Sequence, residues 1–436
     1  MFTRVNCTDG GAFMWGEALL SRVSRRQAER HAGVLLEELA ARMRQRGGVP
    51  LRIELPDGER VDFGPSTQVT WRVRDVARLA HLGEPSLGAL AEAYVKGTIE
   101  IEGDLMESIR IAATLADSFG SPATRRSALI PARHAKSDDL ADVRSHYDLG
   151  NDFYRLWLDE RMIYSCAYFE RGDESLEQAQ VAKLDHICRK LCLAPGDRLL
   201  DVGCGWGGMV LHAARHYGVQ AVGITLSVAQ HDEARERIAQ AGLADRVTVE
   251  ILDYRDLEAR FGAASFDKIS SIGMYEHVGL RRLPTYFGVL ARMLRDRGLL
   301  LNHGISSADV ENRPVGGGAG DFIDRYIFPG GELPHLHTAI RDLSSQGFEV
   351  ADVESLRPHY ALTLRRWLSR LEARRDEAVA LVGEERTRTW LGYLGGTSYG
   401  FDRGWINIYQ VLASRQAAPG PTALPLSRSW IYDASR

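Results

Sequence analysis

Hydrophobic positions recur at helical spacing near the start of the chain. Residues 24–46 place apolar side chains on one face of a helix and many arginines on the rest of its surface. The apolar positions are Leu35, Leu36, Leu39 and Met43. The basic surface has two interpretations, either the solvated face of a packed helix or a contact with anionic lipid headgroups.

Short alternating runs follow this segment. Two of them flank Pro-Asp-Gly at 56–58, a pattern typical of a β-hairpin. Residues 69–75 and 96–102 have the pattern of further strands, with a helical stretch between them. The spacing predicts a small α+β domain over residues 1–120, in which we find no catalytic constellation.

The pattern changes in the rest of the chain. Residues 121–140 are rich in Pro, Ser and Arg and lack periodicity, which is typical of a linker. From 141 to 415, helical patterns alternate with short apolar strands, which predicts an α/β domain around a parallel sheet. Residues 416–436 are Pro-rich and are expected to form an irregular tail.

Composition narrows the possible classes of protein. The 436-residue chain is 44% hydrophobic and 26% charged, as expected of a soluble protein with two domains. Its formal net charge of −4 argues against a nucleic-acid binder. No apolar run reaches about 18 residues and no signal-peptide core is found, so we expect a cytoplasmic protein that is free to attach to a membrane surface. The five cysteines lack a CxxC pair, which argues against a disulfide framework or a structural metal site.

A glycine-rich segment is the strongest candidate for a binding site. Residues 199–202 have the pattern of a buried strand, and Gly203, Gly205 and Gly207 follow before a helical pattern resumes. Glycines at such a turn let the backbone approach a ligand at the helix N-terminus. Because NAD enzymes have similar turns, this motif alone leaves the ligand open.

Three details favour S-adenosylmethionine (SAM). Asp201 lies inside the motif, where its carboxylate can meet the cationic amino group of a methionine moiety. The next strand, at 221–227, lacks the carboxylate that dinucleotide folds use to bind ribose. The strand after it, at 247–252, ends in Asp253 and Tyr254, in position to bracket an adenine.

Seven motifs carry a family resemblance. They are HYDLGNDFY (146–154), YSCAYF (164–169), LLDVGCGWGG (199–208), GITLS (223–227), SIGMYEHVG (271–279), IFPGGELP (327–334) and RPHYALTLRRW (357–367). In this order they resemble the cyclopropane fatty acid synthase family, which includes phospholipid and mycolic acid cyclopropane synthases. The resemblance covers residues 141–415, and 87–105 also resembles the end of the N-terminal domain of the phospholipid enzymes. It implies a Rossmann-like class I SAM-dependent methyltransferase domain behind a smaller N-terminal α+β domain.

The resemblance also implies two sets of site residues. Together with Asp201 and Asp253, the residues expected to bind SAM are Tyr164, Ser165, Gly203, Gly205, Gly207, Thr225, Leu226, Gln230, Tyr254 and Ile272. Many members have Trp where this chain has Tyr254. The second set matches the bicarbonate pocket of the family and consists of Cys166, Glu276, His303, Ile305 and Tyr360.

The implied reaction transfers a methylene group from SAM to the cis double bond of a phospholipid acyl chain. Methyl transfer leaves a carbocation, which a dry pocket protects and aromatic faces stabilise. Candidate aromatic residues are Tyr164, Tyr168, Phe169, Tyr275, Tyr286, Phe287 and Tyr326. Bound bicarbonate would take the proton, with His303 and Tyr360 donating hydrogen bonds to it and Glu276 accepting one from its O–H. Cys166 is then a pocket wall, and a nucleophilic role is the less favoured interpretation.

Alternatives remain at this stage. The same carbocation can give a methylene- or methyl-branched fatty acid, and a non-catalytic lipid-binding protein would also keep the fold. Many members have a cysteine where this chain has Thr397, which is either dispensable or marks a changed reaction. By resemblance we expect a homodimer through the N-terminal domain.

A second basic stretch is open to the same two interpretations as the first. It consists of Arg357, Arg365, Arg366, Arg370, Arg374 and Arg375 around the apolar Leu362, Trp367 and Leu371. It is either a face that docks on anionic lipid or a packed helix with its arginines in water.

Overall fold

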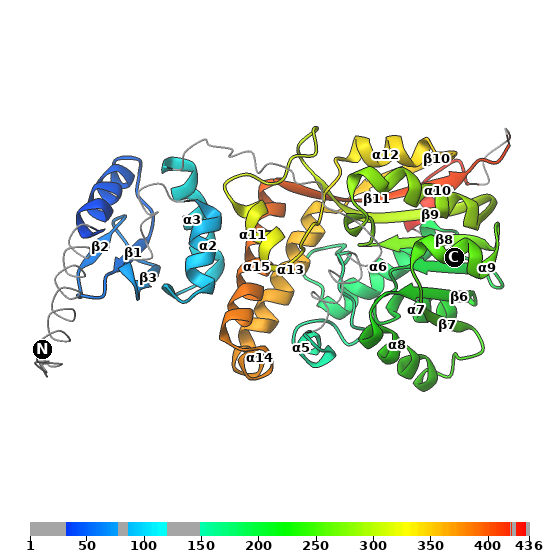
Figure 1. Ribbon diagram of the computed structural model, residues 1–436, viewed down its shortest axis with the longest axis horizontal. Coiled ribbons are helices and arrows are strands. Elements are labelled where there is room, and N and C mark those ends of the chain that lie inside the picture. Colours follow the sequence, from blue (N-terminus) through cyan, green and yellow to red (C-terminus); the bar gives the residue numbers. More distant parts are fainter. Residues whose placement is uncertain (1–31, 77–85, 120–148, 419, 421–423, 433–436) are drawn as a thin grey trace, which may run out of the picture. The chain divides into compact units, whose positions relative to one another are not determined.

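The structure is a computed structural model that describes residues 32–76, 86–119, 149–418, 420 and 424–432. The chain divides into two compact units, Met1–Ala123 and Thr124–Arg436, which we describe separately (Figure 1). The predicted linker at 121–140 and the start of the predicted helix at 24–46 lie outside the described residues.

The first unit packs helices against a four-stranded sheet of order β2-β1-β3-β4. Its elements are the helix over residues 32–45, β1 (Leu51–Glu54), β2 (Arg60–Asp62), β3 (Val69–Val73), α2 (Leu87–Val95), β4 (Ile99–Glu102) and α3 (Leu105–Phe119). β1 and β2 pair antiparallel on either side of the predicted turn, where Gly58 has a φ of 92°. The predicted core positions Leu36, Leu39 and Met43 are buried, but Leu35 is 42% exposed and lies outside the core.

Three arginines of the first helix have partners within this unit. Arg44 forms an ion pair with Glu37, at 2.6 Å. The guanidinium groups of Arg42 and Arg46 lie 4.9 and 5.3 Å from the ring centroid of Phe119. Because these side chains already have partners on their own unit, the packed-helix interpretation is favoured over the lipid contact for residues 32–46.

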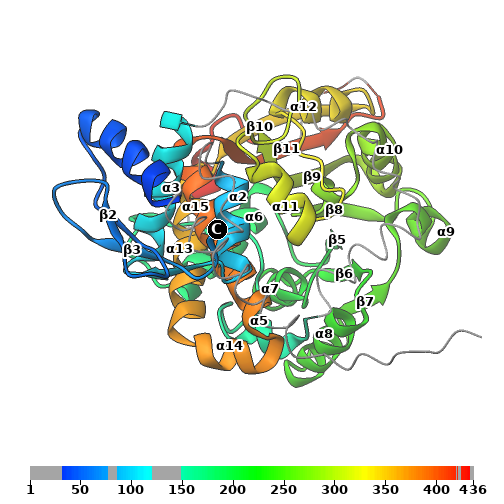
Figure 2. The same ribbon diagram turned by 60° about the vertical axis from the view of Figure 1, so that its left-hand side comes forward.

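The second unit is built around a seven-stranded sheet of order β10-β11-β9-β8-β5-β6-β7, which can be followed across Figure 2. The strands are β5 (Arg198–Val202), β6 (Gln220–Thr225), β7 (Val247–Ile251), β8 (Phe266–Ile272), β9 (Leu294–Ser307), β10 (Phe348–Ser355) and β11 (Ile406–Arg415). The strands from β7 to β9 pair parallel, whereas β11 runs antiparallel between β9 and β10. This arrangement confirms the predicted α/β class.

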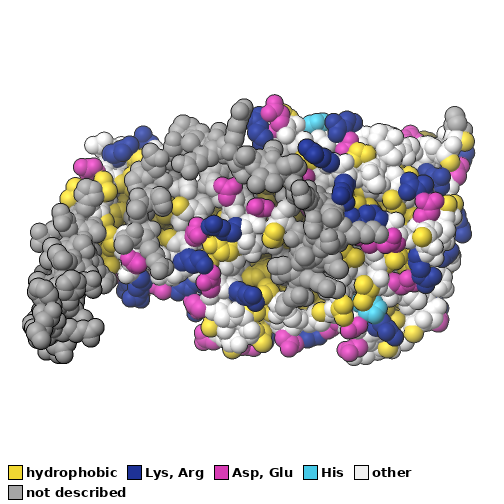
Figure 3. Space-filling view, viewed as in Figure 1, with side chains coloured by type: hydrophobic (Ala, Val, Ile, Leu, Met, Phe, Trp, Pro, Cys, Tyr) yellow, Lys and Arg dark blue, Asp and Glu magenta, His cyan; other side chains and the backbone are white. Residues whose placement is uncertain are grey.

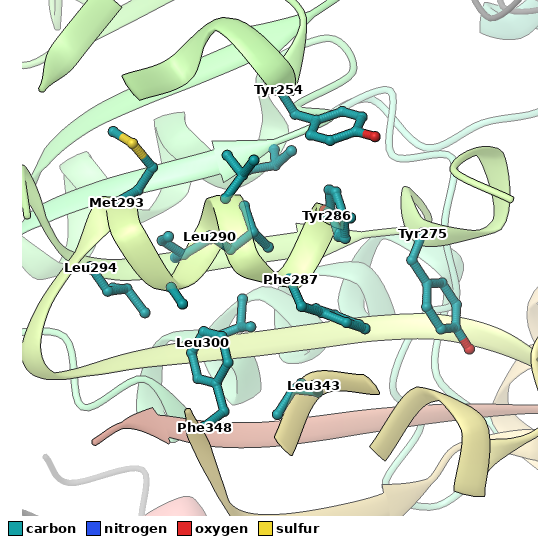
Figure 4. Packing of buried hydrophobic residues seen from close by; sticks show 14 of the residues in the cluster. Tyr254, Tyr275, Tyr286, Phe287, Leu290, Met293, Leu294, Leu300, Leu343 and Phe348 are labelled. Atoms are coloured by element: carbon teal, nitrogen blue, oxygen red, sulfur yellow. The ribbon is translucent and has the colours of Figure 1, made fainter. Parts of the chain in front are cut away.

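Helices cover both faces of this sheet. They are α5 (Asn151–Arg155), α6 (Leu176–Lys190), α7 (Gly208–Tyr217), α8 (Val228–Gln240), α9 (Leu257–Phe261), α10 (Leu283–Met293), α11 (Ala319–Tyr326), α12 (Leu336–Ser344), α13 (Arg357–Ala373), α14 (Arg375–Val382), α15 (Glu384–Arg403) and α16 (Ser429–Tyr432). Because successive strand residues point to opposite faces, Leu200 and Leu300 pack with α9, α10 and α12 (Figure 4), whereas Leu199 and Leu299 pack with α6, α7 and α8.

The second basic stretch forms α13 and the start of α14. Trp367 and Leu371 are fully buried in the core, whereas Leu362, the third apolar residue of the stretch, is only half-buried. Five of its arginines bond to groups of the same unit: Arg357 to the carbonyl of Phe401, Arg365 to Asp402, Arg370 to Glu177, Arg374 to Glu377 and Arg375 to Glu384. On the face shown in Figure 3, basic and acidic side chains are intermixed. The packed-helix interpretation is favoured here too.

The end of the chain departs from the expected irregular tail. The short helix α16 buries Trp430 and Ile431 against α6 and α7, and the carbonyl of Ile431 accepts a hydrogen bond from Arg189 Nε at 2.8 Å. The apolar pair within a Pro-rich segment explains this difference, because its burial completes one side of the core. Among the described residues, no helix is long and apolar enough to cross a membrane.

Candidate active site

The glycine-rich segment forms the turn from β5 to α7. Gly203, Gly205 and Gly207 have φ values of 81°, 53° and 82°, in the left-handed region that glycine adopts without strain. The N–H groups of Gly203 and Cys204 donate to the carbonyl of Ile224 on β6, at 3.0 and 2.9 Å. A Cβ added at Gly205 would meet no protein atom within 4 Å, so the backbone borders open space there.

A pocket opens beside this turn at the carboxyl ends of β5, β6 and β8. The space between its walls is about 1110 Å³ when the open solvent at its mouth is included. The structure brings together in its wall Tyr164, Ser165, Asp201, Gly203, Gly205, Thr225, Leu226, Gln230, Asp253, Tyr254 and Ile272. Gly207 is the one predicted cofactor residue outside this wall, because it forms the N-cap of α7.

The polar wall of the pocket carries a buried acid. Asp201 is 2% exposed, and its Oδ1 accepts a hydrogen bond from Ser270 Oγ at 2.6 Å. Burial raises the pKa of Asp201 to about 6, while the Ser270 hydrogen bond and the charge of Lys183 lower it. On the neighbouring strand, Thr225 Oγ1 donates to Gln230 Oε1 at 2.8 Å. A buried carboxylate in the wall favours a cationic group on the ligand, such as the α-ammonium of SAM.

The opposite part of the pocket is aromatic. Tyr254 begins the short helical turn η2 (Tyr254–Asp256) and packs edge-to-face on Tyr286, with ring centroids 4.9 Å apart (Figure 4). Next to it, the carboxylate of Asp253 accepts hydrogen bonds from the side chain of Arg255. A tyrosine ring beside an anchored carboxylate fits the stacking and hydrogen-bonding needs of an adenosine group.

The pocket wall also contains residues that the sequence did not single out. Trp206 lies inside the glycine motif, and its Nε1 donates to Asn151 Oδ1 at 2.8 Å. Met274 and His277 lie within the SIGMYEHVG motif, so the resemblance pointed to their neighbourhood. Lys183 belongs to no motif and occupies a helical segment with several charged residues, which gave no signal of a binding role.

Glu276, which the resemblance places in a bicarbonate pocket, is a buried acid with one unpartnered oxygen. Glu276 lies in the turn η3 (Tyr275–His277) directly after β8 and is 7% exposed. Its Oε1 accepts a hydrogen bond from the N–H of Ile305 at 2.7 Å, whereas its buried Oε2 has no hydrogen-bond partner among the described residues. Burial raises the pKa of Glu276 to about 7. Since unpaired buried acceptors are costly, Oε2 is a candidate to bind a ligand.

His303 on β9 contributes a matching donor. Its Nδ1 accepts a hydrogen bond from Gln410 Nε2 on the paired strand β11, at 3.1 Å, which puts the ring proton on Nε2. Nε2 is buried and, within the described part of the chain, has no partner. Burial, with the nearby charges of Lys183 and Lys190, holds the pKa of His303 well below its usual value, so the ring is neutral. His303 thus offers a buried N–H donor and Glu276 a buried carboxylate oxygen, the two kinds of group that an ion with both an acceptor oxygen and an O–H requires.

Cys166 and Tyr360 both bond to the backbone of Leu356, which is connected through Ile408 to Ile305. Cys166 Sγ lies 3.9 Å from the carbonyl of Leu356, to which the N–H of Tyr360 also donates, at 3.0 Å. The N–H of Leu356 donates to the carbonyl of Ile408, the residue paired with Ile305 across β11 and β9. Burial raises the pKa of the Cys166 thiol, so the thiol stays protonated. A protonated thiol suits the wall of a pocket, whereas a nucleophile would have to be a thiolate.

Two tyrosines connect the cofactor pocket with the surroundings of Glu276. Tyr164 lines the cofactor pocket, and its hydroxyl lies 3.5 Å from that of Tyr393 on α15. Burial raises the pKa of Tyr393 to about 12; its hydrogen bond with Tyr164 lowers this pKa, and the charge of Glu276 raises it. Tyr393 therefore lies within electrostatic reach of Glu276, and sequence reasoning missed it. Thr397, four residues further along α15, is half-buried and outside the wall of the cofactor pocket.

The aromatic residues expected around the reacting centre divide into two groups. Tyr164 packs among Trp157, Trp367 and Trp390, with ring centroids 5.3, 5.4 and 6.1 Å away. Tyr286, in contrast, is fully buried in the hydrophobic core under the sheet (Figure 4). Periodicity alone could not separate these groups, since both consist of buried rings.

Three other aromatic candidates have packing or hydrogen-bond partners within the protein. Phe287 belongs to the same core as Tyr286. Tyr168 stacks between His186 and His359, with centroid distances of 4.4 and 4.8 Å. The hydroxyl of Tyr275 bonds to the carbonyl of Ile305, at 2.8 Å. Neither Phe287 nor Tyr168 lines the cofactor pocket, so the expectation that they face a reacting cation is not supported.

Comparisons with known proteins agree with this geometry. A family model described as mycolic acid cyclopropane synthetase matches residues 134–411, and one described only as a domain of unknown function matches residues 39–124. The chain is 48% identical over 389 residues to a probable fatty acid methyltransferase of Pseudomonas putida, covering 88% of this chain and 96% of that protein. It is 40% identical over 279 residues to the cyclopropane-fatty-acyl-phospholipid synthase of Escherichia coli strain K12, covering 64% of this chain and 68% of that protein.

A solved structure shares the fold of the second unit. The mycolic acid cyclopropane synthase CmaA1, complexed with SAH and CTAB, matches with a TM-score of 0.59 and 38% identity over 63% of this chain and 98% of that chain. With the glycine turn, the buried acid and the sheet order, this likeness defines the protein as a SAM-dependent methyltransferase with the class I fold. Since its family model spans well over half of the chain, the protein belongs to the mycolic acid cyclopropane synthetase family, that is, to the cyclopropane fatty acid synthases.

Proposed function

We propose that the protein transfers a methylene group from SAM to the cis double bond of an unsaturated phospholipid acyl chain and so forms a cyclopropane fatty acid. Support for a lipid substrate comes from relatives named as a fatty acid methyltransferase and as a cyclopropane-fatty-acyl-phospholipid synthase. Bound SAM supplies an electrophilic methyl group, and the remaining requirements fall on the protein's own residues.

The single observation that carries the proposal is that two of the eight buried side-chain atoms without a partner among the described residues belong to Glu276 and His303. Glu276 Oε2 and His303 Nε2 are buried acceptor and donor atoms without partners among the described residues. In a purely structural site, both would be expected to have partners. We infer that they hold bicarbonate, which would supply the base for the reaction.

The reaction requires a base that the carbocation does not alkylate. The double bond attacks the methyl carbon, the sulfur–methyl bond breaks, and the positive charge moves to the acyl chain. Loss of one proton from the added methyl group then closes the ring. Neutral His303 and Tyr360 donate hydrogen bonds that hold an anion, and Glu276 accepts the hydrogen bond of its O–H. Water is kept out because all three side chains are less than 10% exposed.

The aromatic cluster is suited to a cationic acyl chain. Tyr164 connects the cofactor pocket to Trp157, Trp367 and Trp390, and aromatic faces stabilise a nearby cation by about 0.5–2 kcal/mol each. We propose that the acyl chain lies along this cluster, with its double bond next to the wall that Tyr164 shares with the cofactor pocket.

A second candidate function is the formation of a methylene-branched fatty acid, or of a methyl-branched one after reduction by a partner reductase. The observation that favours it is the 48% identity, along almost the whole chain, to the probable fatty acid methyltransferase of Pseudomonas putida. The two products differ in which proton faces the base, so the same site serves both.

The surroundings of the enzyme follow from a lipid substrate. We propose that it acts at the inner face of the membrane as a peripheral protein and forms a homodimer through its first unit. Light scattering at micromolar concentration tests the dimer, and co-sedimentation with anionic vesicles tests the membrane contact. A monomer, or protein that stays in the supernatant, would remove the corresponding part of the proposal.

The test of the reaction uses purified protein, SAM labelled with ¹³C in its methyl group, and vesicles of cis-unsaturated phospholipid. Labelled cyclopropane carbons with upfield ring protons in NMR spectra of the fatty acids are the expected result. Labelled vinylidene carbons would replace the first candidate by the second, and fatty acids without label would refute both. In buffer freed of carbon dioxide, activity should fall and return with added bicarbonate in the wild type but not in Glu276→Gln.

A further inference from the structure

Helix α6 buries two lysines two turns apart, and only one of them forms ion pairs with carboxylates. Lys190 is fully buried and has two carboxylate partners, Glu354 at 2.5 Å and Asp352 at 3.5 Å. This is the usual arrangement for a structural lysine, because an unpaired buried charge is costly. Lys190 therefore shows how this protein stabilises a buried structural lysine, and Lys183 can be compared with it.

Lys183 is equally buried but lacks such a partner. It is 1% exposed, and its Nζ donates to Ser165 Oγ at 2.9 Å. No carboxylate of the described residues lies within ion-pair distance of Nζ; Asp159, Cys166 and Asp201 face it from further away. Asp159 accepts hydrogen bonds from the N–H groups of Ile163 and Arg161. Burial lowers the pKa of Lys183 to about 8, so the ammonium ion predominates at neutral pH although no carboxylate contacts it.

The position of Lys183 explains why this cost is tolerated. Lys183, Ser165 and Asp201 all line the pocket next to the glycine turn. The wall thus presents a buried cation and a buried acid, and the acid is bonded to Ser270. The amino-acid end of SAM carries the complementary charges, an α-carboxylate and an α-ammonium.

We propose that Lys183 Nζ binds the α-carboxylate of the methionine moiety of SAM, with Ser165 beside it and Asp201 opposite, at the α-ammonium. The ligand then supplies to Lys183 the carboxylate partner that β10 supplies to Lys190 within the protein. This assignment rests on the pocket being the SAM site. In this assignment, Lys183 selects ligands that carry a carboxylate, and this selectivity adds to the affinity of the pocket for adenosine.

The experiment compares two ligands that differ only in this group. S-Adenosylhomocysteine and its decarboxylated analogue, which keeps the amine, are titrated calorimetrically into wild-type protein and into Lys183→Met. The wild type should prefer S-adenosylhomocysteine by about 10- to 100-fold, the range for a hydrogen-bonded ion pair. In Lys183→Met the preference should shrink to a few-fold, through loss of affinity for S-adenosylhomocysteine alone.

The matched control is Lys190→Met on the same helix, which should lower the melting temperature and leave the ligand preference at the wild-type value. Lys183→Met, in contrast, removes an unpaired charge, so its ligand-free melting temperature should equal or exceed that of the wild type. If Lys190→Met does not fold, the ratio of the two ligands within Lys183→Met still decides the question.

The outcomes separate two failures. If the wild type binds neither ligand, the pocket is not the SAM site and the proposed function fails with it. If the wild type binds S-adenosylhomocysteine and Lys183→Met keeps the full preference for it, only the role of Lys183 is overturned. A markedly lower melting temperature of ligand-free Lys183→Met would likewise show that the lysine is structural.

Discussion

Replacement of Glu276 by Gln tests the buried anion site through stability as well as activity. Burial raises the pKa of Glu276 from 4.5 to about 7, and a tenfold change in proton affinity is worth about 1.4 kcal/mol, so the ionised side chain costs about 3 kcal/mol of folding free energy above pH 7. Because the folded-state pKa is the higher one, this cost is absent below pH 4.5 and complete above pH 7. Gln never ionises and keeps an oxygen for the N–H of Ile305.

The assay is urea denaturation of both proteins at pH 5 and pH 8, together with turnover and binding of S-adenosylhomocysteine. Relative to the variant, the wild type should lose about 2 kcal/mol of unfolding free energy between the two pH values. Asp201 also titrates in this range, but it is present in both proteins and cancels. The variant should lose most of its activity and keep its affinity for S-adenosylhomocysteine. A difference in stability that does not change with pH, or wild-type turnover in the variant, would refute the reasoning.

Four further substitutions test separate parts of the structure. His303→Ala should abolish most turnover but not binding of S-adenosylhomocysteine; unchanged turnover would show that its unpartnered Nε2 binds nothing needed for the reaction. Gly205→Ala should lower the affinity for S-adenosylhomocysteine at least about tenfold in calorimetry, because its Cβ enters open space beside the glycine turn, while strain at φ 53° costs only about 1–2 kcal/mol of stability. Gly304→Ala should lower the unfolding free energy by about 2–3 kcal/mol, because its Cβ would lie 2.0 Å from a ring carbon of Tyr275. Gly396→Ala on α15, where a Cβ meets no protein atom within 4 Å, should raise it by about 1 kcal/mol, and equal effects of the two would contradict the packing argument.

The sequence predicted the parts of the site that lie at strand ends. The glycine turn follows β5, Asp201 lies near the end of β5, and Glu276 follows β8. Parallel strands bring these carboxyl ends to one edge of the sheet. Hydrogen-bonded pairs that depend on tertiary contacts were harder to predict from the sequence. The hydrogen bond from Gln410 to His303 joins residues 107 positions apart, and nothing in either segment marks it.

Helix α6 shows a second limit of sequence reasoning. Gln180, Lys183, Ile187 and Lys190 recur at core spacing and are all buried, yet three of them are polar and would be assigned to a solvated face. The physical reason is that α6 packs between the cofactor site and the acids of β10, so its inner face needs charges. The burial of Trp430 and Ile431 was missed for the opposite reason, because prolines around them suggested an irregular segment.

The position of β11 also determines the order in which this enzyme can be completed during synthesis. β10 pairs only with β11 among the described strands, and β11 is made last although it lies inside the sheet, between β9 and β10. Until residues 406–415 have left the ribosome, β10 has no neighbour and His303 has no Gln410 to fix its proton. A nascent chain that already contains every residue of the glycine turn therefore cannot yet hold His303 in the tautomer that the full sheet sets. Catalytic competence should arise only once residues 406–415 are available, in one step with closure of the sheet.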